Sequence, residues 1–327
     1  MDPEVKRKIV TILRILSKEK EPLGASLISR RLRDFGINLS ERAVRYHLKI
    51  MDERGLTQGF GKRGRVITKK GLTELRDALV SDKVGLIISK IDALSCRTTL
   101  NPEEKRGRII LNISFIPEKD FRAALREMRD IFKTRLCMSD LVAVASGGEV
   151  LGDVEIPPGK IGFGTVCSIT LNGVLVNAGI PVYSKFGGIL QMDDFKPMRF
   201  TELITYEGTS LDPLEIFIKG KMTSVREVAR TGTGKILASF REIPAVALEA
   251  ARKMIEELEE INLHGVLAVG EPSQPVLEMS VGVDRVGMVV VGGLNPLAAL
   301  EEVGIETQSK AMSTMIDFGE LKSFWEL

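Results

Sequence analysis

The chain has 327 residues, with 46 Lys and Arg, 44 Asp and Glu and a formal net charge of +2. The small total hides a split: residues 1–80 hold 19 basic and 10 acidic residues, a net of +9, while the remainder holds 27 and 34, a net of −7. A basic module on a larger acidic body predicts that one part approaches a polyanion and the other does not. Three cysteines without C-x-x-C spacing and only two histidines exclude a disulfide framework and a Cys/His zinc site.

The N-terminus predicts no export signal, because an amphipathic segment follows Met1 where a signal peptide would have an uninterrupted apolar core. The most apolar window, Val286 to Leu300, contains three glycines, Asn295 and Pro296 and is too short to cross a bilayer. We therefore expect a cytoplasmic protein with no membrane partner and no metal.

Apolar residues recur at helical spacing in two early segments, from Pro3 to near Lys20 and from Ala25 to Phe35. Gly36 follows the second segment, where a left-handed helix cap is expected. The residues that we expect these two helices to bury are Ile9, Ile12, Leu13, Leu16, Leu27, Ile28 and Leu32.

A third helix is predicted between Ser40, a suitable N-cap, and Gly55. Its apolar positions are Val44, Leu48 and Met51. On the opposite face, Arg42, Arg45, Tyr46 and Lys49 fall at i, i+3, i+4 and i+7, so four donors project from one side. A DNA major groove accepts such a helix, and double-stranded DNA is the expected polyanion.

After this helix, Leu56 to Phe60 and Arg65 to Ile67 predict a hairpin with a basic tip, and Thr68 opens a helix. Leu72, Leu75 and Leu79 should form the inner face of that helix. The succession of three helices, a hairpin and a helix resembles a winged helix-turn-helix within residues 1–81. Its predicted DNA-binding residues are Ser40, Arg42, Arg45, Tyr46, Lys49, Lys62, Arg63 and Arg65.

Other interpretations of these residues remain open. Basic residues on a short helix often form only a solvated face, and Tyr46 could pack on the second helix. His47 shares the side of Val44 and is expected to be packed inside. One short recognition helix per chain predicts a homodimer, or a higher oligomer, on a palindromic operator.

Residues 82–107 are predicted to form a connector, with an apolar helix from Val84 to Leu94 that could carry part of a dimer interface. Residues 108–327 then predict a mixed α/β effector domain rich in antiparallel strands, so the fold class is α+β. The expected strands are Ile109–Ile116, Leu141–Ser146, Ile161–Leu171, Val174–Val176, Val182–Met192, Phe200–Tyr206, Ile216–Lys219, Lys235–Phe240, Val266–Val269 and Met288–Val291. The expected helices contain Phe121 to Phe132, Val246 to Leu263 and Pro296 to Val303, and the two strand–helix passages could be related halves.

An enzyme is not expected, because three glycine-rich stretches lack the residues that a nucleotide site needs. Gly162 to Cys167 has cysteine in place of the third Rossmann glycine, and Ala229 to Ile236 lacks the first Walker glycine and the final Ser or Thr. Gly292 to Pro296, with Asn295 able to cap a helix, is either an anion site or a tight connection. His264 follows a predicted helix and is expected to be a charge partner at its C-terminal end.

The body resembles the archaeal nitrogen-regulation repressor family (NrpR-like). The resemblance rests on Gly164–Gly173, Ala178–Pro181, Phe186–Gly188, Phe200–Glu202, Tyr206–Pro213 and Ala238–Pro244. It implies a winged helix with a single effector domain that represses nitrogen-assimilation genes, binds operators as a dimer or higher oligomer and is released by 2-oxoglutarate. It also implies that Cys167 takes part in the response. Whether the chain acts alone or with a second effector-domain chain is left open.

The chemistry of a keto dicarboxylate requires cationic or amide donors at its ends and small polar groups along its middle. The expected effector-binding residues are Thr165, Cys167, Ser168, Thr170, Asn172, Lys185 and Arg241. If the segment is a strand, only alternate residues line one pocket. Cys167 could instead be a small buried filler, and Arg241 could pair with Glu242; Arg230 and Lys235 are further cations to consider.

Three other functions remain possible on the residues alone. The chain could respond to a different metabolite, it could be a nucleotide-binding enzyme with a DNA-targeting module, or Cys96, Cys137 or Cys167 could sense thiol oxidation.

Overall fold

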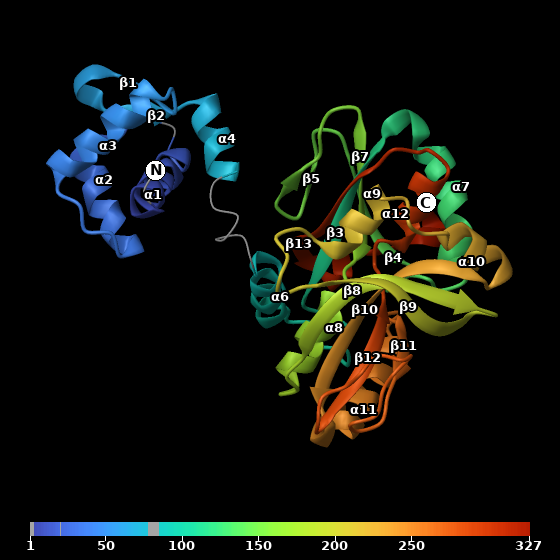
Figure 1. Ribbon diagram of the computed structural model, residues 1–327. Helices are drawn as coiled ribbons and strands as arrows, with labels where there is room; N and C mark the ends of the chain where they lie inside the picture. Colours follow the sequence, from blue (N-terminus) through green and yellow to red (C-terminus); the bar gives the residue numbers. More distant parts are fainter. Residues whose placement is uncertain (1–2, 20, 78–84) are drawn as a thin grey trace. The chain divides into compact units, whose positions relative to one another are not determined.

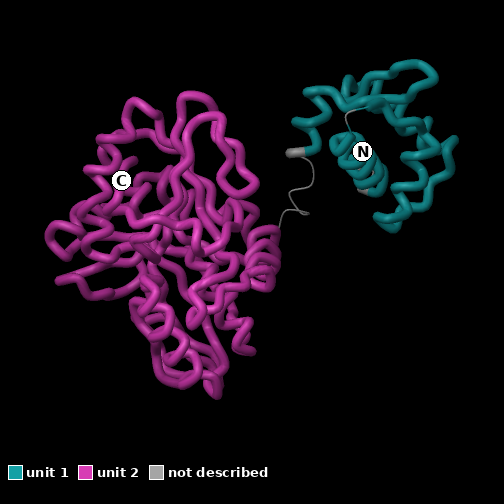
Figure 2. The backbone as a smooth tube through the Cα atoms, turned by 180° about the vertical axis from the view of Figure 1, so that it is seen from behind, with its two compact units in different colours: residues 1–82 teal, residues 83–327 magenta. Residues whose placement is uncertain are grey.

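The chain forms two structural units, Met1–Asp82 and Lys83–Leu327, in the computed structural model (Figures 1 and 2). The structure describes residues 3–19, 21–77 and 85–327. Lys20 and Leu79, which the sequence assigned to helices, and the start of the predicted connector lie outside these residues. The described part contains no helix with the length and apolar composition that a bilayer crossing requires.

The first unit has the predicted order of three helices, a hairpin and a further helix, and its winged-helix fold is confirmed. Its elements are α1 (Pro3–Ser17), α2 (Ala25–Leu32), α3 (Glu41–Glu53), β1 (Thr57–Gly59), β2 (Arg65–Ile67) and α4 (Lys69–Asp77), with single 3-10 turns at Arg33–Phe35 and Gly61–Arg63. Gly36 adopts the expected left-handed conformation, at φ 68°. Leu23 also forms an isolated antiparallel bridge with Arg65, which ties the segment before α2 to the wing.

The core of this unit lies between the first three helices. It contains Ile12, Leu13, Ile28, Leu32 and Leu48, which are all fully buried. Two predicted core residues are wrong: Leu27 is 36% and Leu72 is 41% exposed. Leu27 precedes Ile28 by one residue, so on a helix it points about 100° away from the buried side.

The second unit contains two five-stranded sheets, in which all neighbouring strands are antiparallel. The first sheet has the order β13 (Gln308–Asp317), β3 (Arg108–Pro117), β7 (Lys160–Val166), β4 (Leu141–Ser146), β14 (Lys322–Ser323). The second has the order β11 (Val266–Val269), β12 (Arg285–Val291), β10 (Gly234–Pro244), β8 (Tyr183–Asp193), β9 (Lys196–Thr205). A separate small hairpin joins β5 (Val150–Leu151) to β6 (Val154–Glu155).

Seven helices accompany these sheets in the described residues (Figure 1). They are α6 (Leu86–Arg97), α7 (Phe121–Lys133), α8 (Ile169–Asn177), α9 (Pro213–Lys219), α10 (Val225–Thr231), α11 (Leu248–Glu259) and α12 (Asn295–Glu302). Helix α6, which falls in the predicted connector, packs on α8 and is part of the second unit. The α+β fold class is thus confirmed.

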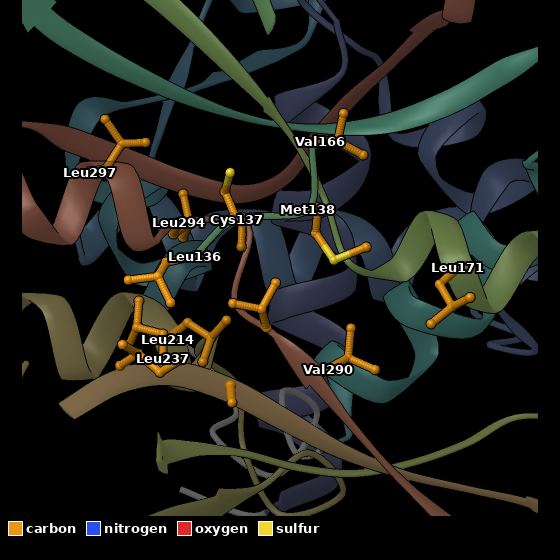
Figure 3. Packing of buried hydrophobic residues seen from close by; sticks show 14 of the residues in the cluster. Leu136, Cys137, Met138, Val166, Leu171, Leu214, Leu237, Val290, Leu294 and Leu297 are labelled. Atoms are coloured by element: carbon orange, nitrogen blue, oxygen red, sulfur yellow. The ribbon is translucent and has the colours of Figure 1, made fainter. Parts of the chain in front are cut away.

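The second unit is built from two related halves, as the sequence suggested. The first half runs β3, α7, β4, β7, α8, β8 and the second runs β10, α11, β11, β12, α12, β13. The last strand of each half is exchanged: β8 pairs with β10 of the second half, and β13 pairs with β3 of the first. One apolar core therefore contains residues of both halves, including Val166 and Leu171 from the first and Leu237, Val290 and Leu294 from the second (Figure 3).

Three predicted strands are wrong in whole or in part, because helices occupy their residues. The sequence placed strands at Ile161–Leu171 and Val174–Val176, but β7 ends at Val166 and α8 follows. All but the last two residues of α8 are buried, so the segment has no polar face and therefore no helical periodicity. The predicted strand at Ile216–Lys219 is the end of α9, which starts at Pro213 with Asp212 as its N-cap.

Candidate nucleic-acid interface and effector site

Helix α3 presents the predicted cationic face to solvent. Ser40 caps the helix, since its side chain accepts a hydrogen bond from the Ala43 amide at 3.3 Å. The side chains of Val44, Leu48 and Met51 are fully buried, and this inner face orients the opposite one outward. The exposed residues on the opposite face are Arg42, Arg45, Tyr46 and Lys49. Tyr46 is 65% exposed, so it does not pack on α2 as the alternative interpretation allowed.

The exposed cations of α3 differ in how they are paired within the described residues. Arg45 forms an ion pair with Glu41, and Lys49 lies 4.0 Å from Glu53, both along the helix surface. Arg42 has no ion-pair partner in the described part of the chain. Exposed pairs contribute at most about 1 kcal/mol, so a phosphate can replace the carboxylate at little cost.

The wing is fixed to α3 through Asp52. The Asp52 carboxylate accepts hydrogen bonds from Arg65 Nε at 2.7 Å and from Thr57 Oγ1 at 2.6 Å. Arg65 is therefore engaged within the fold, whereas Lys62 and Arg63 at the tip are exposed. Arg63 lies over the Phe60 ring at 5.7 Å.

A depression between α2 and the start of α3 adds residues that the sequence analysis missed. Arg30 and Arg33 line it together with Asn38 and Ser40. Both arginines are exposed, and their i, i+3 spacing beside the predicted turn was the available signal. They add hydrogen-bond donors suited to phosphates beside the start of α3.

His47 is buried on the inner side of α3, as expected, and burial lowers its pKa, with a smaller contribution from Lys8. His264 corrects a prediction. It is 9% exposed, and burial lowers its pKa to about 4, so the imidazole is neutral at pH 7 and is not a charge partner of the helix.

Arg241 is the central residue of the candidate effector site. It lies on β10, it is completely buried, and its guanidinium donates only to neutral acceptors. Nη1 donates to the Ser168 carbonyl at 2.8 Å and to Asn172 Oδ1, and Nη2 donates to Ser168 Oγ at 2.7 Å and Ser239 Oγ at 3.2 Å. Nε has no partner among the described residues.

The charge of Arg241 is therefore buried without a carboxylate in contact. Burial lowers its pKa to about 10, which still leaves the guanidinium positively charged at neutral pH. The alternative interpretation, a pair between Arg241 and Glu242, is wrong, because Glu242 accepts instead from the Gly282 amide at 3.4 Å. A buried cation without a counter-ion is costly, so the site is suited to an anionic ligand.

A small cavity lies beside this cluster and holds about 20 Å³, room for a single water molecule. Ser168, which bonds Arg241, lines it. The other lining residues are Ile91, Asn112, Cys167, Ile169, Tyr206, Asp212, Leu214, Gly293, Leu294, Ala311 and Met312. The structure thus brings together the starts of α8 and α12, one from each half.

Two titratable groups of the cavity wall, Cys167 and Tyr206, are neutral at pH 7 because they are buried, whereas the carboxyl of Asp212 is mostly ionised. Burial raises the pKa of Cys167 to about 11 and that of Asp212 to about 6, and it raises the pKa of Tyr206 as well. The wall therefore carries protonated thiol and phenol groups, which can donate hydrogen bonds to a bound carboxylate.

The other predicted effector residues have different surroundings. Thr165 accepts from Asn112 Nδ2 at 3.5 Å, which places it behind the cavity wall. Thr170 accepts from the Ile110 amide at 3.1 Å and has a structural role. Lys185 is exposed and lines no part of the cavity, and Arg230 and Lys235 are also exposed.

The sequence analysis missed Asn112, Tyr206, Asp212 and Ser239. Tyr206 and Asp212 lie in one of the motifs that carry the family resemblance, but their side chains gave no separate signal. The possible anion site at Gly292 to Pro296 is filled: the Asn295 side chain bonds both the amide and the carbonyl of Leu237, and Leu294, not Asn295, is the N-cap.

No group of three or more His, Cys, Asp or Glu side chains in the described ranges is arranged to hold a metal ion. Cys137 is buried and its pKa is raised to about 12 by burial, whereas Cys96 is exposed. The thiols of Cys137 and Cys167 are thus protonated at neutral pH, which makes them poor redox sensors.

The fold and these sites define a class of two-unit proteins, in which a winged helix is followed by a duplicated α/β unit with a buried polar cluster. A family model described as NrpR regulatory domains NRD1 and 2 matches residues 84–323, and a Ribonuclease R winged-helix domain model matches residues 10–75. The chain belongs to the NrpR family.

Curated relatives cover both units. The global nitrogen regulator NrpRI of Methanosarcina mazei is 41% identical over 98% of this chain and 99% of its own length. The global nitrogen regulator NrpR of Methanocaldococcus jannaschii is 34% identical over 96% of this chain, which spans only 54% of that relative. These relatives are named as regulators and not as enzymes.

A solved structure supports the fold of the larger part of the chain. The crystal structure of a nitrogen repressor-like protein from Methanococcus jannaschii matches with a TM-score of 0.61 and 31% identity, covering 72% of this chain and 97% of that one.

Proposed function

We propose that this protein is a cytoplasmic transcriptional repressor of nitrogen-assimilation genes. It binds a palindromic double-stranded operator as a homodimer or higher oligomer, and 2-oxoglutarate releases it. The names of the family members support the regulatory role, and the exposed cationic face of α3 supports DNA as the partner. The observation that carries the effector part is Arg241, a completely buried cation whose partners among the described residues are all neutral.

In the proposed mechanism, the exposed face of α3 enters the major groove with Arg42, Arg45, Tyr46 and Lys49. The wing contacts the DNA phosphate backbone through Lys62 and Arg63. In the second unit, a carboxylate of the keto acid binds the guanidinium of Arg241. Ser168, Asn172 and the Cys167 thiol supply further donors or acceptors to the ligand. The ligand favours a conformation in which the two recognition helices of a dimer no longer match the operator.

The polar surroundings of Arg241 suit a dicarboxylate better than the alternatives. The cavity offers no glycine-rich cradle for a nucleotide, since the Gly292–Pro296 turn is filled by its own side chains. Thiol sensing by Cys137 or Cys167 is disfavoured because burial keeps both thiols protonated.

Fluorescence anisotropy of the full chain on DNA from upstream of its own gene tests this proposal. We expect 2-oxoglutarate, but not citrate, to release the DNA, and we expect binding to weaken steeply with salt. Replacing Arg42 and Arg45 together with alanine should weaken binding at least about tenfold and reduce the salt slope by about two, because two phosphate or base contacts are lost. Lys18→Ala, at an exposed position after α1, is the matched control and should change little. Binding that is insensitive to the keto acid would contradict the effector assignment, and an unchanged salt slope in the double variant would contradict the DNA-binding face.

A further inference from the structure

Helix α6 is placed to respond directly to whatever occupies the cavity beside Arg241. It begins at Leu86, soon after the division between the two units at residues 82 and 83. Its inner face is buried and includes Ile87, Ile91 and Leu94. Ile91 lines the cavity directly, and the three residues belong to one apolar cluster with Cys167 and Tyr206.

The outer face of α6 is exposed, so nothing in the second unit covers the helix from outside within the described residues. Its exposed residues are Leu86, Ser89, Lys90, Asp92, Ala93, Cys96 and Arg97. The other cavity walls come mainly from strands β3 and β13, from the starts of α8 and α12, and from the 206–214 segment. Moving β3 or β13 would break the backbone hydrogen bonds of a sheet, whereas the N-terminal part of α6 belongs to no sheet.

The two ends of α6 are held differently. At the C-terminal end, the Thr98 carbonyl accepts from Asn177 Nδ2 at 2.7 Å, and Thr98 packs so closely on α8 that a Cβ on Gly173 would lie 2.3 Å from its side chain. Toward the N-terminal end, Lys90 Nζ donates a hydrogen bond to the Ala311 carbonyl of β13 at 3.3 Å. The helix is therefore anchored at Thr98 and held mainly by apolar contacts at its other end.

We propose that α6 is the element that couples effector binding to DNA release. This inference rests on the proposed function, because it takes the same cavity as the effector site. A keto dicarboxylate is several times larger than the single water molecule for which the cavity has room, so the cavity must widen on binding. The wall that yields is α6, which pivots about its anchor at Thr98 and moves its N-terminal end, the end nearest in sequence to the winged helix.

Hydrogen–deuterium exchange of the full chain tests this movement, with calorimetric titration of 2-oxoglutarate on the same sample. With ligand bound, the amides of residues 86–91 should exchange about tenfold faster, while those of α7 keep their protection. Binding accompanied by unchanged or greater protection of α6 would overturn the inference and leave the proposed function standing. Absence of binding in the titration would remove the proposed function and this inference with it.

A pair of variants tests the coupling itself. Asn177→Ala removes the hydrogen bond that anchors α6, and Leu86→Ala changes an exposed residue of the same helix as the matched control. We expect Asn177→Ala to bind 2-oxoglutarate normally but to reduce the effect of the ligand on DNA affinity about tenfold, with the control unchanged. A normal ligand effect on DNA affinity in Asn177→Ala would overturn the coupling role. If this variant does not fold, the exchange experiment on the unmodified chain decides the question.

Discussion

The two halves of the second unit use the same architecture but keep different chemistry at the junction between strand and helix. In the first half, Thr170 bonds both the amide and the carbonyl of Ile110; in the second, Asn295 bonds the same two groups of Leu237. The Cys167 amide donates to the Ile110 carbonyl at 2.9 Å, and the Gly292 amide donates to that of Leu237 at 2.8 Å. The same hydrogen bonds to the backbone therefore occur at both junctions.

The side chains around the two junctions differ. Ser168 and Gly293 are each the second residue after their strand, and Arg241 and Ser114 each stand three residues before the proline that ends the first strand of their half. At the first junction Ser168 bonds the Arg241 guanidinium, whereas Ser114, at the position equivalent to Arg241, bonds Ser309 Oγ at 2.8 Å. We infer that one junction is kept polar for a ligand and the other is closed for stability.

Exchanging the residues at the equivalent positions should have the largest effect. A Cβ on Gly293 would lie 2.3 Å from the Val166 carbonyl oxygen, so Gly293→Ser must displace backbone and should cost about 4 kcal/mol or more of unfolding free energy. The reverse exchange, Ser168→Gly, should cost about 1–2 kcal/mol, because it removes a hydroxyl that bonds Arg241 but leaves the carbonyl bond. Urea unfolding measures both, and equal costs would refute the distinction between the junctions.

Removing the side-chain hydrogen bonds that Asn295 and Thr170 make at the two junctions should have the next largest effect on the free energy of unfolding. Asn295→Ala leaves the buried Leu237 amide without this acceptor and opens space in the core, at a cost of about 3 kcal/mol. Thr170→Val keeps the shape and loses only the hydroxyl, so about 1–2 kcal/mol is expected. The urea midpoints of the two variants measure these costs. A larger loss of stability for Thr170→Val than for Asn295→Ala would contradict the roles that we assign to the two side chains.

The halves should also differ in pH dependence, because His264 and Cys137 stand at equivalent places, each the second residue after a left-handed turn residue, Asn262 and Arg135. The pKa of His264 is lowered to about 4 in the fold, below its usual 6.5, so the unfolded chain binds the proton first. Stability should fall as the pH drops from about 6.5 to about 4, by about 2 kcal/mol in total.

Trp325 reports on this change, since it is the single tryptophan and lies in the second unit. Following its fluorescence, His264→Gln should flatten the pH dependence between 6.5 and 4. His47→Gln, in the first unit, is the control and should leave the slope for the second unit unchanged. An equally steep slope in His264→Gln would show that other groups carry the effect.

The sequence predicted the first unit well because each of its elements has one exposed and one buried face. Periodicity therefore located α3 and its cationic side, and Ser40 and Gly36 marked helix ends. In the second unit, α8 is buried almost all round, and its β-branched residues resemble a core strand. Ser168 and Asn172 are four residues apart, a spacing that places both on one side of a strand and also of a helix. They were therefore expected on one side, and both bond Arg241.

Arg241 was named from its charge, but its contacts and the other residues of the site could not be predicted because they join distant segments. Arg241 reaches Ser168 across 73 positions of sequence, and the cavity joins α6 to the starts of α8 and α12. Lys185 has a suitable charge, but its place on β8 exposes it to solvent. Charge and composition reveal which residues could bind an anion. Which of these residues is buried depends on the strand exchange between the halves, which the sequence does not show.

The most direct test of the account is a calorimetric titration of 2-oxoglutarate into the full chain, into Arg241→Met and into Ser114→Ala, the variant at the equivalent position of the other half. Methionine fills much of the volume without a charge, so the fold should survive, as a thermal melt would verify. We predict that Arg241→Met weakens binding about 100-fold, while Ser114→Ala keeps the affinity of the unmodified chain. Equal affinity in all three proteins would contradict the claim that the buried guanidinium holds the effector.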